Sequence, residues 1–382
     1  MAKTIAILIG FLPNPRIYKR IALEKQIGDV QLICWDRGNS MLQAPVDDGY
    51  KSHVIQVKAG GNPLKRLLPY QKFSKRANAL LDQIQPDLIH VQGLDMLKIA
   101  CAYKKRSTKP VHIIYEVADL HRLLVDHQTS LIAKLAQKYL RFTDRKLEKQ
   151  YDLLVVTSMK YYDVYFNNFV PKNKVLYMPN VPDLSAFSSY QKKVAGKFTV
   201  GYLGAVRYKK QMMNLIEASE RMGDHVLIAG YEDQPNIIEP MCQGKPNIEW
   251  VGRFDFNKQA ATLYGKCDVM YSVYDADMHN VRVALPNKLY EAVYCEMPLI
   301  VAKNTYLAQV VEEWGVGVAV DHKSVDELAA ALKELRENTA LREQIAENCR
   351  KHKDEIDLQK YNAQLKDEIV RLLEKSDCKF SQ

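Results

Sequence analysis

Residues 284–301 read Ala284-Leu-Pro-Asn-Lys-Leu-Tyr-Glu-Ala-Val-Tyr-Cys-Glu-Met-Pro-Leu-Ile-Val301. This order of residues is typical of a loop, a short helix, a break at Pro298 and a buried strand. Asn287 is expected to cap the helix by accepting a hydrogen bond from a backbone N–H two or three residues further on. Leu289 begins an apolar stripe at helical spacing. The stretch therefore indicates one helix and one strand of an α/β domain.

Strands and helices alternate along the rest of the chain, which is typical of parallel sheets covered by helices on both faces. Residues 183–197 are polar and patternless, and are interpreted as a linker. We predict two Rossmann-like doubly wound domains facing across a cleft, over residues 1–185 and 195–357, and a C-terminal segment over 358–382. Strands are expected at residues 5–10, 30–35, 54–57, 88–91, 111–117, 153–157 and 175–178, and again at 198–203, 225–229, 248–251, 269–273, 299–301 and 317–320. The clearest helices are expected at residues 16–28, 62–84, 94–103, 131–150, 212–222, 258–266, 324–335, 341–352 and 361–373.

The composition places the chain among globular proteins. Of its 382 residues, 47% are hydrophobic and 26% are charged, which leaves room for two sizeable cores. No apolar run reaches the ~18 residues that a bilayer-spanning helix needs, and the run at residues 5–9 is too short for a signal peptide. The seven cysteines form no C-x-x-C pair, so we expect reduced thiols in a cytoplasmic protein.

The positive charge of the chain is concentrated in its first half. The net charge is +9, and residues 1–180 alone carry +13. Residues 58–76 mix cations with leucine and aromatic residues, and residues 141–149 form a second basic face. This pattern indicates contact with an anionic membrane surface, although a solvated helix face gives the same pattern. No nucleic-acid-binding motif is present, so nucleic acid is not expected as a partner.

Two loops in the second half carry residues suited to phosphate. Gly201-Tyr-Leu-Gly204 ends a predicted strand, and Arg207 and Lys210 follow in the next loop. Glycine permits close backbone approach to a ligand, and the cations neutralise phosphate charge. Lys288 stands at the start of a predicted helix, where free N–H groups attract anions, and Glu291 can accept hydrogen bonds from a ribose or sugar diol. An ordinary glycine turn and a surface helix remain the alternatives.

Polar residues also follow two predicted strands of the first half. His90 lies near the end of one strand, and Asp119 and His121 follow another. A carboxylate or imidazole in these places could orient a sugar hydroxyl, although each could equally be structural. Residues 275–280, Asp-Ala-Asp-Met-His-Asn, lack a recognisable ligand spacing, so no metal site is predicted.

Taken together, these motifs resemble those of GT-B fold glycosyltransferases, close to the retaining family 4 enzymes that build bacterial surface polysaccharides. Residues 286–291, Pro-Asn-Lys-Leu-Tyr-Glu, are similar to the P-[SN]-K-L-x-E element of that group. Residues 201–210 resemble its first donor-phosphate loop, residues 10–16 its N-terminal loop, and residues 87–90 its D-[LIV]-I-H strand. The resemblance covers nearly the whole chain and implies that the last helix crosses back to the first domain.

The resemblance implies a retaining, metal-independent transfer of a sugar from a UDP or GDP sugar to a glycan or lipid-linked acceptor, with no cofactor. It also implies a protein on the cytoplasmic face of the membrane. Asp119 and His121 would be catalytic, and Arg16 and His90 would contact the acceptor. The donor would be bound by Gly204, Arg207, Lys210, Asn287, Lys288, Leu289 and Glu291.

Three positions depart from the family pattern. Val283 stands eight residues before Glu291, where the family often has a first glutamate. Ala205 replaces the arginine expected after Gly204, and Ala118 replaces a histidine. Two other hypotheses therefore stay open, namely a non-catalytic partner that binds sugar nucleotides and a GT-B-like sugar-nucleotide epimerase.

Overall fold

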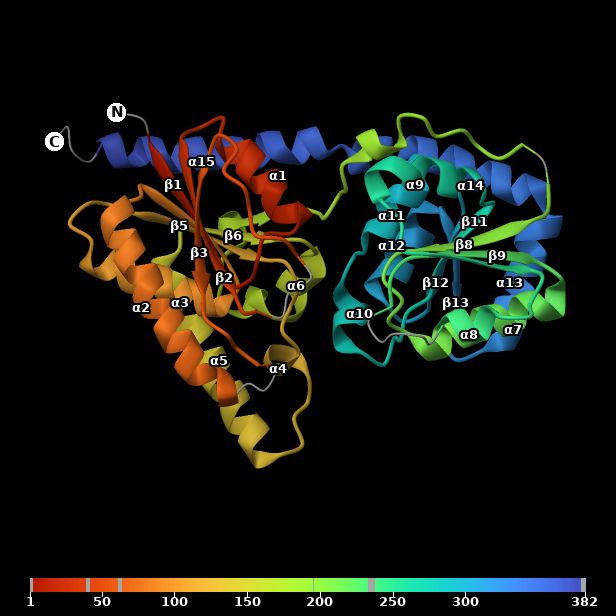
Figure 1. The fold of residues 1–382 in the computed structure, drawn as a ribbon, viewed down its shortest axis with the longest axis horizontal. Coiled ribbons are helices and arrows are strands. Elements are labelled where there is room, and N and C mark those ends of the chain that lie inside the picture. Colours follow the sequence, from red (N-terminus) through yellow and green to blue (C-terminus); the bar gives the residue numbers. More distant parts are fainter. Residues whose placement is uncertain (1–2, 39–41, 61–63, 195, 233–237, 379–382) are drawn as a thin grey trace. The chain divides into compact units, whose positions relative to one another are not determined.

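The computed structural model describes residues 3–38, 42–60, 64–194, 196–232 and 238–378. The chain divides into two compact units, which are described separately below (Figure 1). The first unit comprises residues 1–179 together with 359–382, and the second comprises residues 180–358. Residues 62–63 of the expected second helix, residue 195 and the last four residues of the expected tail lie outside the described residues.

The first unit is built on a seven-stranded parallel sheet in the order β3-β2-β1-β4-β5-β6-β7. From β1 the chain first adds β2 and β3 on one side and then returns to add β4 to β7 on the other side. The sheet therefore has the topological switch point of a doubly wound fold between β1 and β4. Its strands are β1 (Thr4–Ile9), β2 (Asp29–Asp36), β3 (Lys51–Gln56), β4 (Leu88–Gln92), β5 (His112–Val117), β6 (Leu153–Val156) and β7 (Val175–Tyr177).

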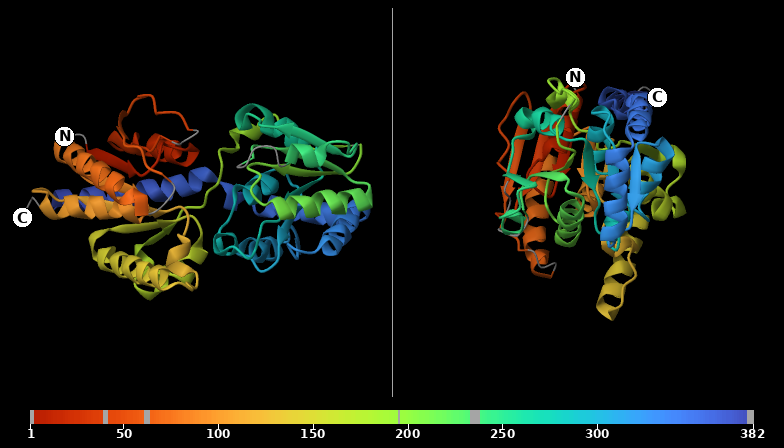
Figure 2. Two further views of the ribbon diagram at one scale, coloured as in Figure 1. Left: turned by 60° about the horizontal axis from the view of Figure 1, so that its bottom comes forward. Right: turned by 90° about the vertical axis from the view of Figure 1, so that its right-hand side faces the viewer.

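Helices cover both faces of this sheet (Figure 2). Ile17 and Ile21 of α1 (Pro15–Glu24) pack in one cluster with Leu32 of β2. The ring of Phe73, in α2 (Leu67–Ile84), stacks on Trp35 of β2, which lies an odd number of residues from Leu32 and therefore on the opposite face. The other helices are α3 (Leu94–Arg106), α4 (Arg122–Val125), α5 (Leu131–Leu147), α6 (Met159–Val164) and α15 (Leu358–Cys378), with short 3-10 turns η1 (Leu64–Arg66), η2 (Glu148–Gln150), η3 (Phe166–Asn168) and η4 (Lys172–Lys174).

The second unit repeats the design with six parallel strands in the order β10-β9-β8-β11-β12-β13. The switch point now lies at β8. Its strands are β8 (Thr199–Leu203), β9 (His225–Ala229), β10 (Ile248–Gly252), β11 (Val269–Ser272), β12 (Leu299–Ala302) and β13 (Gly317–Val320). Its helices are α7 (Lys209–Met222), α8 (Ile238–Cys242), α9 (Phe256–Gly265), α10 (His279–Val283), α11 (Asn287–Tyr294), α12 (Tyr306–Trp314), α13 (Val325–Glu337) and α14 (Thr339–Lys351), with turns η5 (Leu184–Phe187) and η6 (Lys353–Ile356).

The predicted α/β architecture with two parallel sheets is confirmed, and the expected linker needs correction. Residues 180–194 belong to the second unit, because Phe187 in η5 is buried there with its ring centroid 5.0 Å from that of Tyr264. The hydroxyl of Tyr190 donates to the Cys295 carbonyl at 3.0 Å. A few apolar side chains are therefore enough to fold a segment whose composition is typical of a linker.

The last helix belongs to the first unit, although the second unit precedes it in the chain. Leu365 and Ile369 of α15 are fully buried, and the ring of Tyr361 meets that of Tyr177 edge-on, with centroids 5.9 Å apart. In the described part of the chain, no helix combines the length and apolar character needed to span a bilayer.

Candidate functional site

The carboxyl edge of the second sheet brings together the two loops that the sequence analysis selected for phosphate. Gly204 follows β8, the strand at the switch point, where ligands of doubly wound sheets bind. A Cβ atom placed on Gly204 would lie 3.5 Å from Cε of Lys288 and 3.8 Å from its Nζ. The lysine at the start of α11 therefore lies over the glycine turn, as the combination of the two motifs predicted.

Glycine is required on both sides of this turn. Gly204 has φ +141°, a backbone conformation that L side chains rarely adopt. A Cβ atom on Gly230, which follows β9, would meet the Gly204 carbonyl oxygen at 1.7 Å. The two turns are also joined by the Gly204 N–H, which donates to the Ala229 carbonyl at 2.8 Å. The backbone at the end of β8 is thus held against its neighbour and keeps its open conformation.

The start of α11 differs from the prediction in one respect. Pro286, in an extended conformation, is the N-cap residue, and Asn287 is the first residue of the helix. Asn287 therefore does not cap α11, and the N-cap residue Pro286 offers no side-chain acceptor. The side-chain oxygen of Asn287 instead accepts a hydrogen bond from the side-chain amide of Asn180, which belongs to the same unit. The first turn of α11 therefore lacks the side-chain cap that Asn287 was expected to provide, and a helix N-terminus of this kind is suited to an anion.

Glu291 is the buried centre of the site, with only 2% of the residue exposed. The Lys288 Nζ lies 2.5 Å from its Oε2, and the Tyr264 hydroxyl donates to the same oxygen. Burial raises the pKa of Tyr264 well above its usual value and the Glu291 charge raises it further, so the phenol keeps its proton. Both contacts from the described residues fall on Oε2 of Glu291. Its Oε1 is therefore left to accept a hydrogen bond from a ligand hydroxyl.

The other predicted donor residues surround this centre. Leu289 is fully buried and anchors α11, while Arg207 and Lys210 are exposed near the start of α7. Burial raises the pKa of Tyr274 to about 12 against a hydrogen bond with Ser272 that lowers it. Glu291 raises this pKa further and Arg207 lowers it, so both charges act on this phenol. The site thus combines exposed cations, a glycine turn and a buried carboxylate.

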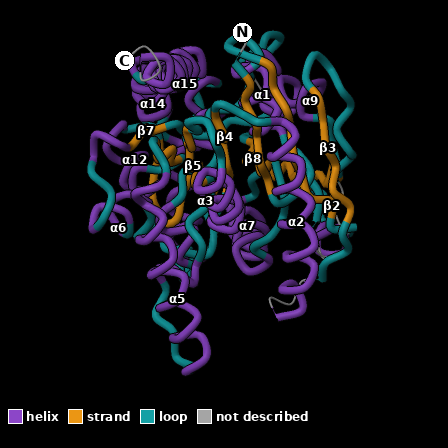
Figure 3. Tube along the Cα trace, turned by 90° about the vertical axis from the view of Figure 1, so that its left-hand side faces the viewer, coloured by secondary structure: helices purple, strands orange, loops and turns teal. Residues whose placement is uncertain are grey.

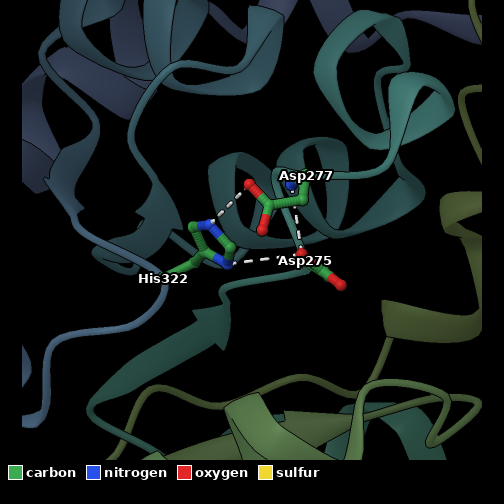
Figure 4. A group of neighbouring side chains, drawn as sticks. All are labelled: Asp275, Asp277 and His322. Atoms are coloured by element: carbon green, nitrogen blue, oxygen red, sulfur yellow. Dashed lines mark hydrogen bonds and ion pairs between the residues drawn. The ribbon is translucent and has the colours of Figure 1, made fainter. Parts of the chain in front are cut away.

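Asp275, Asp277 and His322 also meet at this edge (Figure 4). His322 follows β13, and its Nδ1 lies 3.5 Å from Asp275 while its Nε2 lies 3.7 Å from Asp277. The three could offer ligand atoms to a metal ion, but the Lys323 ammonium already lies 2.6 Å from Asp277 Oδ2. The Gln211 side-chain amide donates to the His322 carbonyl at 3.3 Å, so the cluster ties the end of β13 to the start of α7.

The carboxyl edge of the first sheet holds Arg16 and Asp119. Asn14 caps α1 by accepting from the Ile17 N–H at 3.2 Å, which places half-buried Arg16 in the first turn after β1. Asp119 is exposed in the loop after β5. Burial raises the pKa of Tyr161, Asp119 raises it further and Arg16 opposes it, so both charges act on this phenol. The predicted acceptor arginine and the predicted catalytic carboxylate thus follow two strands of the same sheet.

His121 has a structural role in addition to any chemical one. Its Nδ1 accepts from the Leu123 N–H at 3.2 Å and caps the short helix α4. Although the residue lies at the surface, partial desolvation of its ring lowers its pKa, and Arg122 lowers it further. The imidazole is therefore neutral near pH 7.

His90 is part of a buried network rather than of an accessible surface. The residue is 3% exposed, with Nδ1 2.5 Å from Glu24 Oε1 and Nε2 3.1 Å from Glu116 Oε2. Arg20 completes the network through its Nε, 2.9 Å from Glu116. Contact with an acceptor, which the sequence analysis expected, would require His90 to leave both carboxylates. Burial lowers its pKa, but the two glutamates raise it more, to about 9.

Sequence reasoning missed Tyr264 and Asn180 in the second unit. Tyr264 lies 27 residues before Glu291, and no local pattern links a tyrosine inside α9 to that carboxylate. His322 was also missed, although its position directly after a predicted strand could have indicated the carboxyl edge of the sheet.

Comparison with known proteins is consistent with this geometry. Residues 186–352 match the family model of glycosyl transferases group 1. The succinoglycan biosynthesis protein ExoL of Rhizobium meliloti is 23% identical over 343 residues, which cover 86% of this chain and 83% of that protein.

Two solved structures share the whole fold. Sucrose-phosphate synthase from Thermosynechococcus elongatus superposes with a TM-score of 0.72 at 16% identity, covering 98% of this chain and 100% of that chain. Anabaena HepE, solved in complex with UDP, gives a TM-score of 0.66 at 14% identity, covering 97% and 100%. The chain therefore has the GT-B fold, and its residues 186–352 resemble the glycosyl transferases group 1 family.

Proposed function

We propose that the protein is a glycosyltransferase that moves a sugar, with retention of configuration, from a UDP or GDP sugar to a glycan or lipid-linked acceptor in polysaccharide synthesis. The observation that carries the proposal is the convergence of Gly204, Lys288 and Glu291 at the start of α11. The binding of UDP by HepE and the role of ExoL in succinoglycan synthesis support the same donor class and product class.

The donor diphosphate would lie on the first turn of α11, beside Lys288. An ammonium group has three N–H donors, so Lys288 can keep its contact with Glu291 and still donate to a phosphate oxygen. Arg207 and Lys210 would offset the charge that develops on the leaving nucleotide. Such preorganised charge typically supplies several kcal/mol, which allows transfer without a metal ion. Glu291 Oε1 would accept from the ribose diol.

The first unit would bind the acceptor, with Arg16 in direct contact with it. Asp119 and the neutral imidazole of His121 would lie close to the reacting hydroxyl. The basic surface of this unit would face an anionic membrane on its cytoplasmic side. The six cysteines with described side chains are buried and unpaired, which suits a reducing compartment.

The decisive experiment is sugar transfer from a panel of UDP and GDP sugars after treatment with EDTA. We expect turnover without added metal, a product with the anomeric configuration of the donor, and loss of turnover in Lys288→Met. Nucleotide binding with no turnover on any donor would favour a non-catalytic partner, and C2-epimerised sugar nucleotide would favour an epimerase. Unchanged turnover in Lys288→Met would refute the donor site.

A further inference from the structure

Helix α5 exposes an unusual amount of apolar surface. Its side chains Leu131, Ile132, Leu135, Tyr139 and Phe142 are between 60% and 79% exposed. Single exposed apolar residues are normal on a protein surface, but five on one helix mark an interaction site. We call this set the α5 stripe.

The stripe occupies one face of α5. Leu131, Leu135, Tyr139 and Phe142 follow one another at intervals of four, four and three residues, and Ile132 lies one position on, so all five project from the same side of a helix. Other faces hold the helix in place. Asp144 is fully buried, and Arg141 Nε donates to the Leu124 carbonyl of α4 at 2.7 Å. The stripe is therefore the outward side of a helix that is already anchored.

The exposed charges beside the stripe are all positive. Lys134, Lys138, Arg145 and Lys146 are exposed, whereas Asp144, the single acidic residue of α5, is buried. An apolar face bordered by cations is complementary to a bilayer with anionic headgroups. A second copy of this chain would instead place lysines opposite lysines, and lysine is depleted in protein–protein interfaces.

The position of the stripe in the fold suits a surface-bound substrate. In parallel sheets the helix that follows a strand begins at the carboxyl edge, so the first turn of α5 lies at the edge that carries Arg16 and Asp119. Leu67 and Leu68, at the start of α2, are 60% and 70% exposed at the same edge. Figure 3 shows the ends of α2 and α5 extending beyond the strands on this side of the first unit.

We propose that the α5 stripe inserts into the interfacial layer of an anionic bilayer, while the neighbouring lysines contact lipid headgroups. This docking holds the carboxyl edge of the first sheet at the membrane, where the polar head of a lipid-linked acceptor is found. The inference rests on the membrane contact proposed above and names the element that makes it, but it does not depend on the donor site.

The test is flotation of the full chain with phosphatidylcholine vesicles, with and without phosphatidylglycerol. We expect binding that requires phosphatidylglycerol, and a loss of roughly tenfold or more in the partition coefficient for Ile132→Glu/Leu135→Glu. The matched control is Val46→Glu/Val194→Glu, which makes the same change at side chains that are 80% and 98% exposed elsewhere. This control should bind within roughly twofold of the wild type. Lys134→Gln/Lys138→Gln should weaken the preference for phosphatidylglycerol.

Each other outcome contradicts a specific step. Equal binding of the wild type and the stripe variant would overturn the stripe and leave another surface as the membrane contact. If the wild type bound neither kind of vesicle, both the docking of the α5 stripe and the proposed membrane contact of the first unit would be overturned. A wild-type dimer that the stripe substitutions dissociate, without vesicle binding, would assign the face to a second copy. Thermal shifts with UDP or GDP, compared with and without the stripe substitutions, report separately on folding and on the donor site.

Discussion

Replacing Lys288 by methionine tests the energetic coupling at the centre of the proposed donor site. The substitution keeps the length and most of the volume of the side chain but removes the ammonium that lies 2.5 Å from Glu291. Removal of one partner from a fully buried ion pair costs about 3–5 kcal/mol. The Glu291 side chain is 2% exposed and that of Lys288 13%, so we expect a value near the lower limit, about 3 kcal/mol.

A loss of this size lowers the Tm of a domain like the second unit by roughly 6–12 °C. Urea unfolding followed by circular dichroism would measure it. In calorimetric titrations with UDP and GDP, we expect the affinity to fall roughly 10- to 100-fold, because a hydrogen bond to a charged phosphate is lost. The double variant Lys288→Met/Glu291→Gln should recover at least about 1 kcal/mol relative to the sum of its single variants.

The control is Lys303→Met in the same unit. Lys303 pairs with Glu327 at 2.7 Å, but the two side chains are 48% and 43% exposed. We expect a change within about 0.5 kcal/mol and no effect on nucleotide affinity. If Lys288→Met were no more harmful than this control, or if it left UDP and GDP affinity intact, the assignment of the site would be refuted.

Three further predictions concern buried groups. Burial lowers the pKa of His90, but Glu24 and Glu116 raise it more, to about 9. Protonated His90 therefore contributes about 3 kcal/mol to the free energy of unfolding; this contribution is complete below the unfolded pKa of about 6.5 and is lost as the pH rises through 9. The free energy of unfolding of His90→Gln should lack this dependence on pH. Burial raises the pKa of Asp144 to about 7, so stability falls as the pH rises from about 4 to 7, and Asp144→Asn should exceed the wild type by roughly 4 kcal/mol at about pH 8 but match it near pH 4 in urea unfolding. Gly230→Ala should cost more than about 3 kcal/mol and abolish the thermal shift with UDP or GDP, because its Cβ would lie 1.7 Å from a carbonyl oxygen; normal melting would contradict this.

The sequence was sufficient to predict the sheets but not the short helices. Every strand of both units was anticipated within a few residues, because apolar runs between glycine, proline and polar breaks are local signals. Helices α8 and α10 have five residues each and were not predicted, since helices of this length are stable only through tertiary packing. The nine-residue helix α12 was also missed.

The site was predictable where it depends on loops at strand ends. The approach of Lys288 to Gly204 followed from topology, because both lie at the carboxyl edge of one sheet. The proposed cap at Asn287 was wrong because Pro286 already adopts the extended conformation of the N-cap residue. Residues 131–150 were predicted to form a basic helix, but a single sequence does not reveal which apolar side chains of a helix remain uncovered.

The division of the chain has a consequence for synthesis. The first unit lacks α15 until the whole second unit has been translated, and α15 supplies Leu365, Ile369 and Leu372 to its core. At about 5–20 residues per second, the ribosome needs on the order of 10–40 s to make the intervening residues 180–358. During that time the first unit lacks the buried side chains of α15, whereas the second unit is fully translated at the end of it. Nascent chains of this protein therefore complete the second unit before the first.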